Sequence, residues 1–117
     1  MLPMAASTEE LIELAKSKDL YKALLRQLTK DFSLANIELD LDLTTEPREL
    51  KRILLNEVQR LIEEEKEQFV NLLYIVDLPE NYFINNANKN VLTTSEELTF
   101  LILKRIWQKV WYKNFYT

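Results

Sequence analysis

Apolar residues recur every three or four positions along most of the chain, the spacing that gathers them on one face of an α-helix. The first stripe is formed by Leu11, Ile12, Leu14 and Ala15, and the second by Leu20, Leu24, Leu25, Leu28 and Phe32. At about 100° per residue the two stripes do not line up, so we predict two helices with a bend at Ser17–Lys18. Ser7 and Glu10 have capping-box spacing for the first helix, and Asp19 is placed to cap the second.

Residues 37–43 follow a different rule, because apolar and acidic residues alternate there without exception, as in a half-buried β-strand. Such a strand needs a partner: residues 90–93 of the same chain, or the same segment of a second copy. The residues expected to carry self-association are Ile37, Leu39, Leu41 and Leu43. Asp40 and Asp42 share the other face, where they are either solvated carboxylates or ligands of a divalent cation.

Pro47 suits the first position of a helix, and one apolar stripe then continues from Leu50 to Val76, before Pro79. Glu65 falls in the middle of this stripe, which makes it a candidate for a buried carboxylate. It would either have a raised pKa and act as an acid or ligand, or be paired with a cation such as Arg105. Two alternatives leave Glu65 in solvent: a bend at residues 63–65, or a stripe that overhangs the core. In the following loop, asparagines take the place of glycine in left-handed turns: Asn81, Asn85, Asn86, Asn88 and Asn90.

Thr94 and Glu97 repeat the capping-box spacing and open a last helix. Its first turns, from Leu98 to Leu103, are apolar around most of the circumference and predict a central core helix. Farther on, Trp107 and Trp111 continue the core side. The opposite side presents basic and aromatic residues as candidates for partner binding: Arg105, Lys109, Tyr112, Lys113 and Tyr116.

The fold class that these patterns predict is mostly α. We expect a compact bundle of about four helices with one short extended or β segment at residues 37–43, all within a single domain of residues 1–117. No apolar run approaches the ~20 residues of a membrane-spanning helix, and the first residues do not resemble a secretory signal. A cytoplasmic location is therefore expected.

The chain contains no glycine, no histidine and no cysteine. These absences exclude phosphate-binding glycine loops, histidine bases, thiolate nucleophiles, disulfides and the common zinc sites. We therefore predict no catalytic residues, no cofactor and no metal. Charge is unevenly distributed: residues 1–90 carry 11 basic against 17 acidic residues, whereas residues 91–117 carry 4 against 2.

The leading hypothesis for function is a non-enzymatic interaction or assembly protein that binds a protein partner or itself, as a possible homodimer. The alternative is a binder of an anionic surface, RNA or an acidic partner, through the basic aromatic C-terminal helix. The acidic balance of residues 1–90 makes nucleic acid the less expected ligand. An enzyme that uses Glu65, Asp40 and Asp42 is the third hypothesis, and it requires that these carboxylates share a cleft.

Overall fold

The computed structural model describes residues 2–78 and 90–115, with the backbone alone at Val91. These residues form five helices and no β-strand: α1 Thr8–Ser17, α2 Tyr21–Leu34, α3 Pro47–Glu64, α4 Lys66–Ile75 and α6 Val91–Phe115. The predicted class, a mostly helical compact bundle, is confirmed. Pro79, Asn81, Asn85, Asn86, Asn88 and Tyr116 lie outside the described residues.

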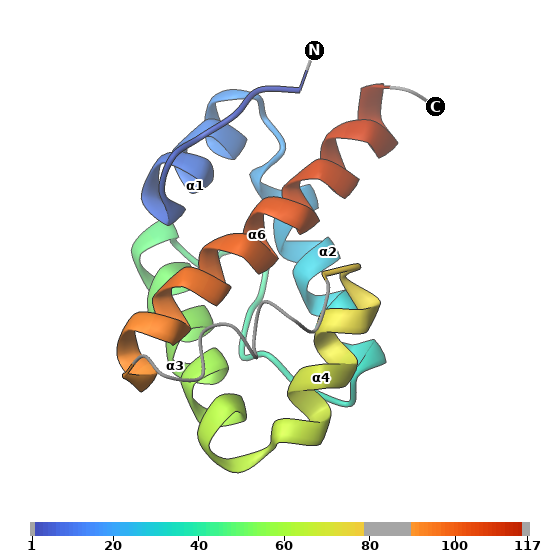
Figure 1. Ribbon diagram of the computed structural model, residues 1–117. Coiled ribbons are helices and arrows are strands. Elements are labelled where there is room, and N and C mark those ends of the chain that lie inside the picture. Colours follow the sequence, from blue (N-terminus) through green and yellow to red (C-terminus); the bar gives the residue numbers. More distant parts are fainter. Residues whose placement is uncertain (1, 79–89, 116–117) are drawn as a thin grey trace.

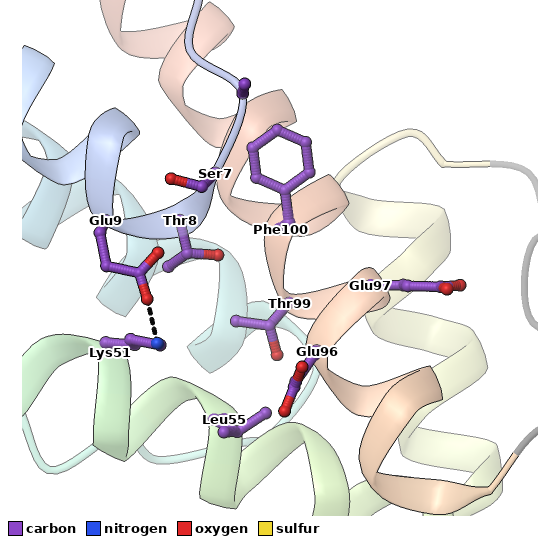
Figure 2. Close-up of a pocket in the computed structure, with 10 residues that line it drawn as sticks. Ser7, Thr8, Glu9, Lys51, Leu55, Glu96, Glu97, Thr99 and Phe100 are labelled. Carbon is purple, nitrogen blue, oxygen red and sulfur yellow. Dashed lines mark hydrogen bonds and ion pairs between the residues drawn. The ribbon is translucent and has the colours of Figure 1, made fainter.

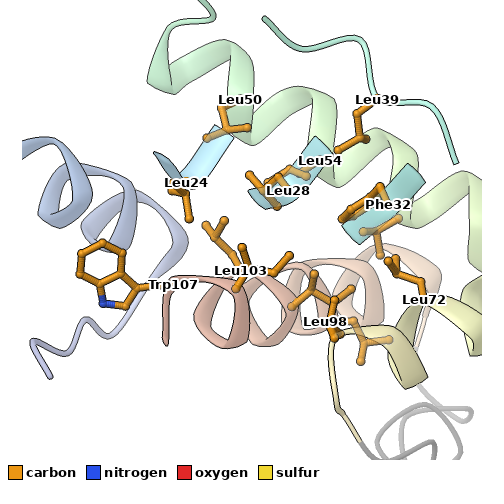
Figure 3. Packing of buried hydrophobic residues seen from close by; sticks show 14 of the residues in the cluster. Leu24, Leu28, Phe32, Leu39, Leu50, Leu54, Leu72, Leu98, Leu103 and Trp107 are labelled. Carbon is orange, nitrogen blue, oxygen red and sulfur yellow. The ribbon is translucent and has the colours of Figure 1, made fainter. Parts of the chain in front are cut away.

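Helix α6 is the central element, as its apolar first half predicts. It crosses the bundle diagonally and packs against α1, α2 and α3 (Figure 1). Figure 3 shows side chains of α2 between those of α3 and those of α6. The labelled members of this layer are Leu24, Leu28, Phe32, Leu50, Leu54, Leu98 and Leu103. Each is at most 1% exposed, so the predicted stripes face one common core.

Helix α1 begins as the capping box predicts. The Ser7 Oγ accepts a hydrogen bond from the Glu10 amide at 3.1 Å, and the Glu10 carboxylate accepts one from the Ala6 amide at 2.9 Å. Helix α3 likewise begins at Pro47. The predicted cap of the next helix is wrong, because α2 begins after Leu20 without a side-chain cap.

Asp19 instead serves the end of α1, where it takes a left-handed backbone with φ 58°. The Leu20 amide donates to Ala15 O at 2.8 Å and the Asp19 amide donates to Lys16 O at 3.0 Å, the bonding pattern of a Schellman motif. Helices α2 and α4 end in the same pattern, with Asn36 and Asp77 in the left-handed position. Short polar side chains therefore replace glycine at three helix ends.

The single long helix predicted after Pro47 is interrupted at Glu65, where the backbone leaves the helical region with φ −137° and ψ 61°. Two helices result, and α4 packs against both α3 and α2. Glu65 is exposed, so the prediction of a buried carboxylate is wrong and the alternative of a bend at residues 63–65 is confirmed. A straight helix would hold this carboxylate against the core, at the cost of its hydration.

Residues 37–43 are extended but do not form a strand, and the Leu41 amide donates to Leu39 O in a tight local turn. The alternation still sorts the side chains, since Ile37 and Leu39 are buried whereas Glu38, Asp40 and Asp42 are exposed. Pairing with residues 90–93 is ruled out, because α6 already begins at Val91. The Asn90 Oδ1 accepts the Thr93 amide at 2.8 Å, so Asn90 takes the capping position predicted for Thr94.

Candidate functional site

Lys109, predicted to bind a partner, is committed to an internal ion pair. Its Nζ donates to Asp31 Oδ2 at 2.7 Å and to Ile75 O at 3.1 Å. Asp31 is only 2% exposed, and its other oxygen accepts a hydrogen bond from Gln27 Nε2 at 2.9 Å. The side chain of Lys109 therefore links α2, the end of α4 and α6, which is a structural role.

Arg105 is also occupied within the chain. One guanidinium nitrogen lies 2.9 Å from Asp77 Oδ2, just beyond α4, and another donates to Gln108 Oε1 at 2.9 Å. The predicted pairing of Arg105 with Glu65 is therefore wrong. Of the other residues proposed on this face, Tyr112 is 48% exposed and Lys113 is exposed.

Both tryptophans of α6 belong to the core, as their position on the apolar side predicts. Trp107 is 1% exposed, and its Nε1 donates to Pro3 O at 3.1 Å. The ring of Trp111 lies between Trp107 and Phe115, stacked on Phe115 with ring centroids 4.1 Å apart. These rings anchor the N-terminal segment and the last turns of α6, and Phe115 alone among the three is largely exposed.

A second set of cations, on α2, lies in solvent. Lys22, Arg26 and Lys30 are four residues apart and exposed, so they form a row along one face of the helix. We call these three residues the cationic stripe. None of the three forms an ion pair with any residue in the part of the chain that the structure describes.

The cationic stripe borders a groove between α2 and the last turns of α6. One hollow of about 580 Å³ is lined by Lys16, Lys22, Arg26 and Asn114, and another of about 250 Å³ by Arg26, Lys30, Lys113 and Asn114. Since Ala23, Arg26 and Asn114 line both, the two hollows adjoin each other, and together we call them the cationic groove. Its described lining has five basic side chains, Lys16, Lys22, Arg26, Lys30 and Lys113, against one carboxylate, Asp19.

On the other side of the stripe lies an apolar hollow of about 490 Å³, between α2 and residues 41–43. Leu25, Leu41 and Leu43 line it together with Arg26, Lys30 and Asp42. Two of the residues predicted for self-association, Leu41 and Leu43, therefore line a surface hollow. The other two, Ile37 and Leu39, are 3% and 7% exposed and pack in the core.

The sequence did contain a signal for the cationic groove. Residues 16–30 hold five basic residues and a single acidic one. Counting charge over residues 1–90 hides this stretch, because the acidic residues gather elsewhere, mainly at 38–49 and 57–67. Local counting combined with the four-residue spacing identifies the stripe, although only the fold brings Lys113 beside it.

Another hollow, of about 330 Å³, lies where the start of α1 meets α3 and α6 (Figure 2). The Lys51 ammonium is bonded to the Glu9 carboxylate and holds the pKa of that carboxyl below its ordinary range. The polar lining also includes Ser7, Thr8, Glu96, Glu97 and the buried Thr99, whose hydroxyl has no hydrogen-bond partner among the described residues. Because the lysine is already paired with a carboxylate, the hollow offers no activated nucleophile next to a base.

The carboxylates proposed for an enzyme do not converge. Glu65 lies at the junction of α3 and α4, and the hollow that Asp42 lines includes neither Glu65 nor Asp40. Asp42 has a local role: its carboxylate accepts hydrogen bonds from the amide and hydroxyl of Thr44, and the hydroxyl bond lowers the pKa of Asp42. Within the described residues, no three acidic side chains are grouped so that they could hold a metal ion.

Comparison with known protein families, with curated proteins and with solved structures finds no match for this chain. Across residues 2–78 and 90–115, no helix combines the length and the apolar character needed to cross a membrane.

Proposed function

We propose that this chain is a non-enzymatic binding protein whose cationic groove takes an acidic segment of a protein partner. The observation that supports the proposal is the gathering of five exposed cations around two adjoining hollows, with no ion pair to any described residue. Like charges four residues apart on a helix repel one another by a few tenths of a kcal/mol per pair. An anionic ligand would relieve that repulsion in all pairs of the stripe.

An acidic protein segment fits this surface better than a nucleic acid does. The chain carries 19 acidic against 15 basic residues, so its overall field repels a long polyanion. Base stacking needs exposed aromatic faces. Among the described residues that line the groove, the one aromatic is Tyr21, which is half-buried and has its hydroxyl bonded to Thr45 O at 2.6 Å. The adjoining apolar hollow provides a place for hydrophobic side chains of a peptide.

The proposal is tested with a fluorescent oligoglutamate peptide, measured by fluorescence polarisation at low salt. We expect binding that weakens as salt rises, because the contacts are exposed and screened. The variant Arg26→Glu/Lys30→Glu should lose affinity by about tenfold or more, since two attractive contacts become repulsive.

The control is Arg48→Glu/Lys66→Glu, which changes the net charge equally at two exposed positions outside the groove. Both lie at the first turns of helices, where glutamate is well tolerated. Equal loss in both variants would contradict a groove-specific site. Tighter binding of an RNA oligonucleotide of the same charge would overturn the assignment of an acidic protein segment.

A further inference from the structure

We propose that the acidic segment taken by the cationic groove comes from a second copy of this chain. Its exposed residues Glu38, Asp40 and Asp42, which we call the acidic strap, would dock on the cationic stripe of the partner copy. This inference rests on the proposed function and names the occupant of the same site.

The spacing of the two charge rows is the first argument. Alternate residues of an extended chain repeat every ~6.6 Å, and residues four apart on an α-helix repeat every ~6 Å. The Leu41 amide bonds Leu39 O, so the chain tightens at Asp40 and follows the extended repeat only in part. The long, flexible side chains of Lys22, Arg26 and Lys30 can adjust to the positions of the three carboxylates.

The three carboxylates of the acidic strap are available to a partner, because they are exposed and form no ion pair with any described residue. Arg52 lies close enough to Asp40 for their charges to interact, but its guanidinium is hydrogen-bonded to Glu49 at 2.7 Å. Asp42 is held by Thr44, which fixes the position of its carboxylate without neutralising it. All three are accessible from outside.

The relative position of the two rows is the second argument. After α2 the chain turns at Asn36, and residues 37–45 run back beside α2. The Ile37 amide bonds Phe32 O, whereas Thr45 O accepts the Tyr21 hydroxyl, so the strap is antiparallel to the helix. The segment that carries the strap therefore runs beside the helix that carries the stripe, and Asp42 lines the same hollow as Arg26, Lys30 and Leu43.

A surface with this pattern is complementary to itself. Rotation by a twofold axis between the rows places the strap of each copy against the stripe of the other, so two equivalent contacts form at once. The same rotation brings the two apolar hollows together and covers Leu43, which is 41% exposed in the single chain. The geometry thus gives charge pairing at the rim and apolar contact at the centre.

The first measurement is light scattering of the wild-type chain over a range of concentration. At low ionic strength we expect a mass twice the 14.0 kDa of one chain. High salt should return it to the monomer, because exposed charges are screened beyond a Debye length of about 3 Å at 1 M.

Charge exchange identifies the interface. The stripe variant Arg26→Glu/Lys30→Glu has two acidic rows, and the strap variant Glu38→Lys/Asp40→Lys has two basic rows; each alone should be monomeric at low salt. An equimolar mixture should recover the dimer mass, since each contact then joins opposite charges. Asp42 is left unchanged because it holds the turn. Recovery also shows that both variants are folded, and Arg48→Glu/Lys66→Glu should remain dimeric.

The outcomes separate this inference from the proposed function. A wild-type chain that is monomeric at low salt but binds oligoglutamate overturns the second copy as occupant and leaves the groove as a binding site. A monomer that binds no oligoglutamate overturns both. A dimer that persists in both charge variants, or a mixture that stays monomeric although circular dichroism shows folded chains, overturns the strap-on-stripe interface.

Discussion

Two helices of this bundle carry rows of basic residues, and the fold uses them in opposite ways. On α6, Arg105 and Lys109 face the ends of α4 and α2, where Asp77 and Asp31 bind them at 2.9 and 2.7 Å. On α2, Lys22, Arg26 and Lys30 face outward and meet no described carboxylate. The comparison shows that a basic side chain stays available for a partner only where the neighbouring elements place no carboxylate within ion-pair distance of it.

The largest effect on the stability of the protein should come from the internally paired basic residues of α6. Replacing Lys109 by methionine leaves the Asp31 carboxylate, which is 2% exposed, without its cation, and we expect a loss of roughly 3 kcal/mol in the free energy of unfolding. The measurement is urea denaturation. Lys113→Met, one turn later on the same helix and exposed, is the control and should stay within about 0.5 kcal/mol. Equal losses of stability in the two variants would contradict the structural role of Lys109.

A smaller loss of stability should follow from replacing Tyr21, whose hydrogen bond connects α2 to Thr45 beside the groove. Its hydroxyl donates to Thr45 O at 2.6 Å, and burial raises the pKa of Tyr21 to about 12. Tyr21→Phe should cost about 1 kcal/mol near neutral pH.

The pH dependence of this bond has a definite sign. A pKa raised on folding stabilises the protein fully below the ordinary tyrosine value of about 10. That stabilisation should be lost as the pH rises from about 10 towards 12, where the hydroxyl ionises and can no longer donate. Alkaline unfolding of the wild type and of Tyr21→Phe should therefore converge. A constant difference between the two up to pH 12 would contradict the raised pKa.

The smallest effect should have the opposite sign. Arg26→Glu replaces two repulsions within the cationic stripe by attractions to Lys22 and Lys30, so we expect the free energy of unfolding to rise by about 0.5 kcal/mol. Binding of oligoglutamate should weaken in the same variant. A gain in stability accompanied by a loss of binding is typical of a surface kept for function. Thermal denaturation at low salt measures the change in stability. A loss of stability would mean that Arg26, like Arg105 and Lys109, is paired within the chain.

Much of the bundle could be predicted from local patterns. The apolar stripes, the capping box at Ser7, the start at Pro47 and the burial of Trp107 and Trp111 follow from periodicity and from residue chemistry within one or two helical turns. The interruption at Glu65 was visible only as an acidic residue inside an apolar stripe. A bend and a buried ion pair explain that pattern equally well at the level of sequence, and the fold selects the bend.

The candidate site was harder to predict, because charges far apart in sequence decide it. Lys109 and Asp31 are 78 residues apart, and Arg105 and Asp77 are 28 apart. Nothing local to α6 indicates that these cations are occupied, and nothing local to α2 indicates that Lys113 joins its groove. The alternation of residues 37–43 predicted correctly that Ile37 and Leu39 are buried and that the three acidic residues are exposed, but Leu43 is exposed as well. The fold gives this segment no strand as a hydrogen-bond partner among the described residues.

By itself, then, the sequence determined most of the residues that enter the core, where α1 and α3 begin, and which chemistry is excluded by the absence of glycine, histidine and cysteine. These properties depend on side-chain type and on short-range spacing. The tertiary structure decided which charges remain available at the surface. It alone brings Asp31 and Asp77 within ion-pair distance of α6 and leaves the cationic stripe of α2 without an ion pair among the described residues, because electrostatic pairing depends on distances in space that helix packing sets.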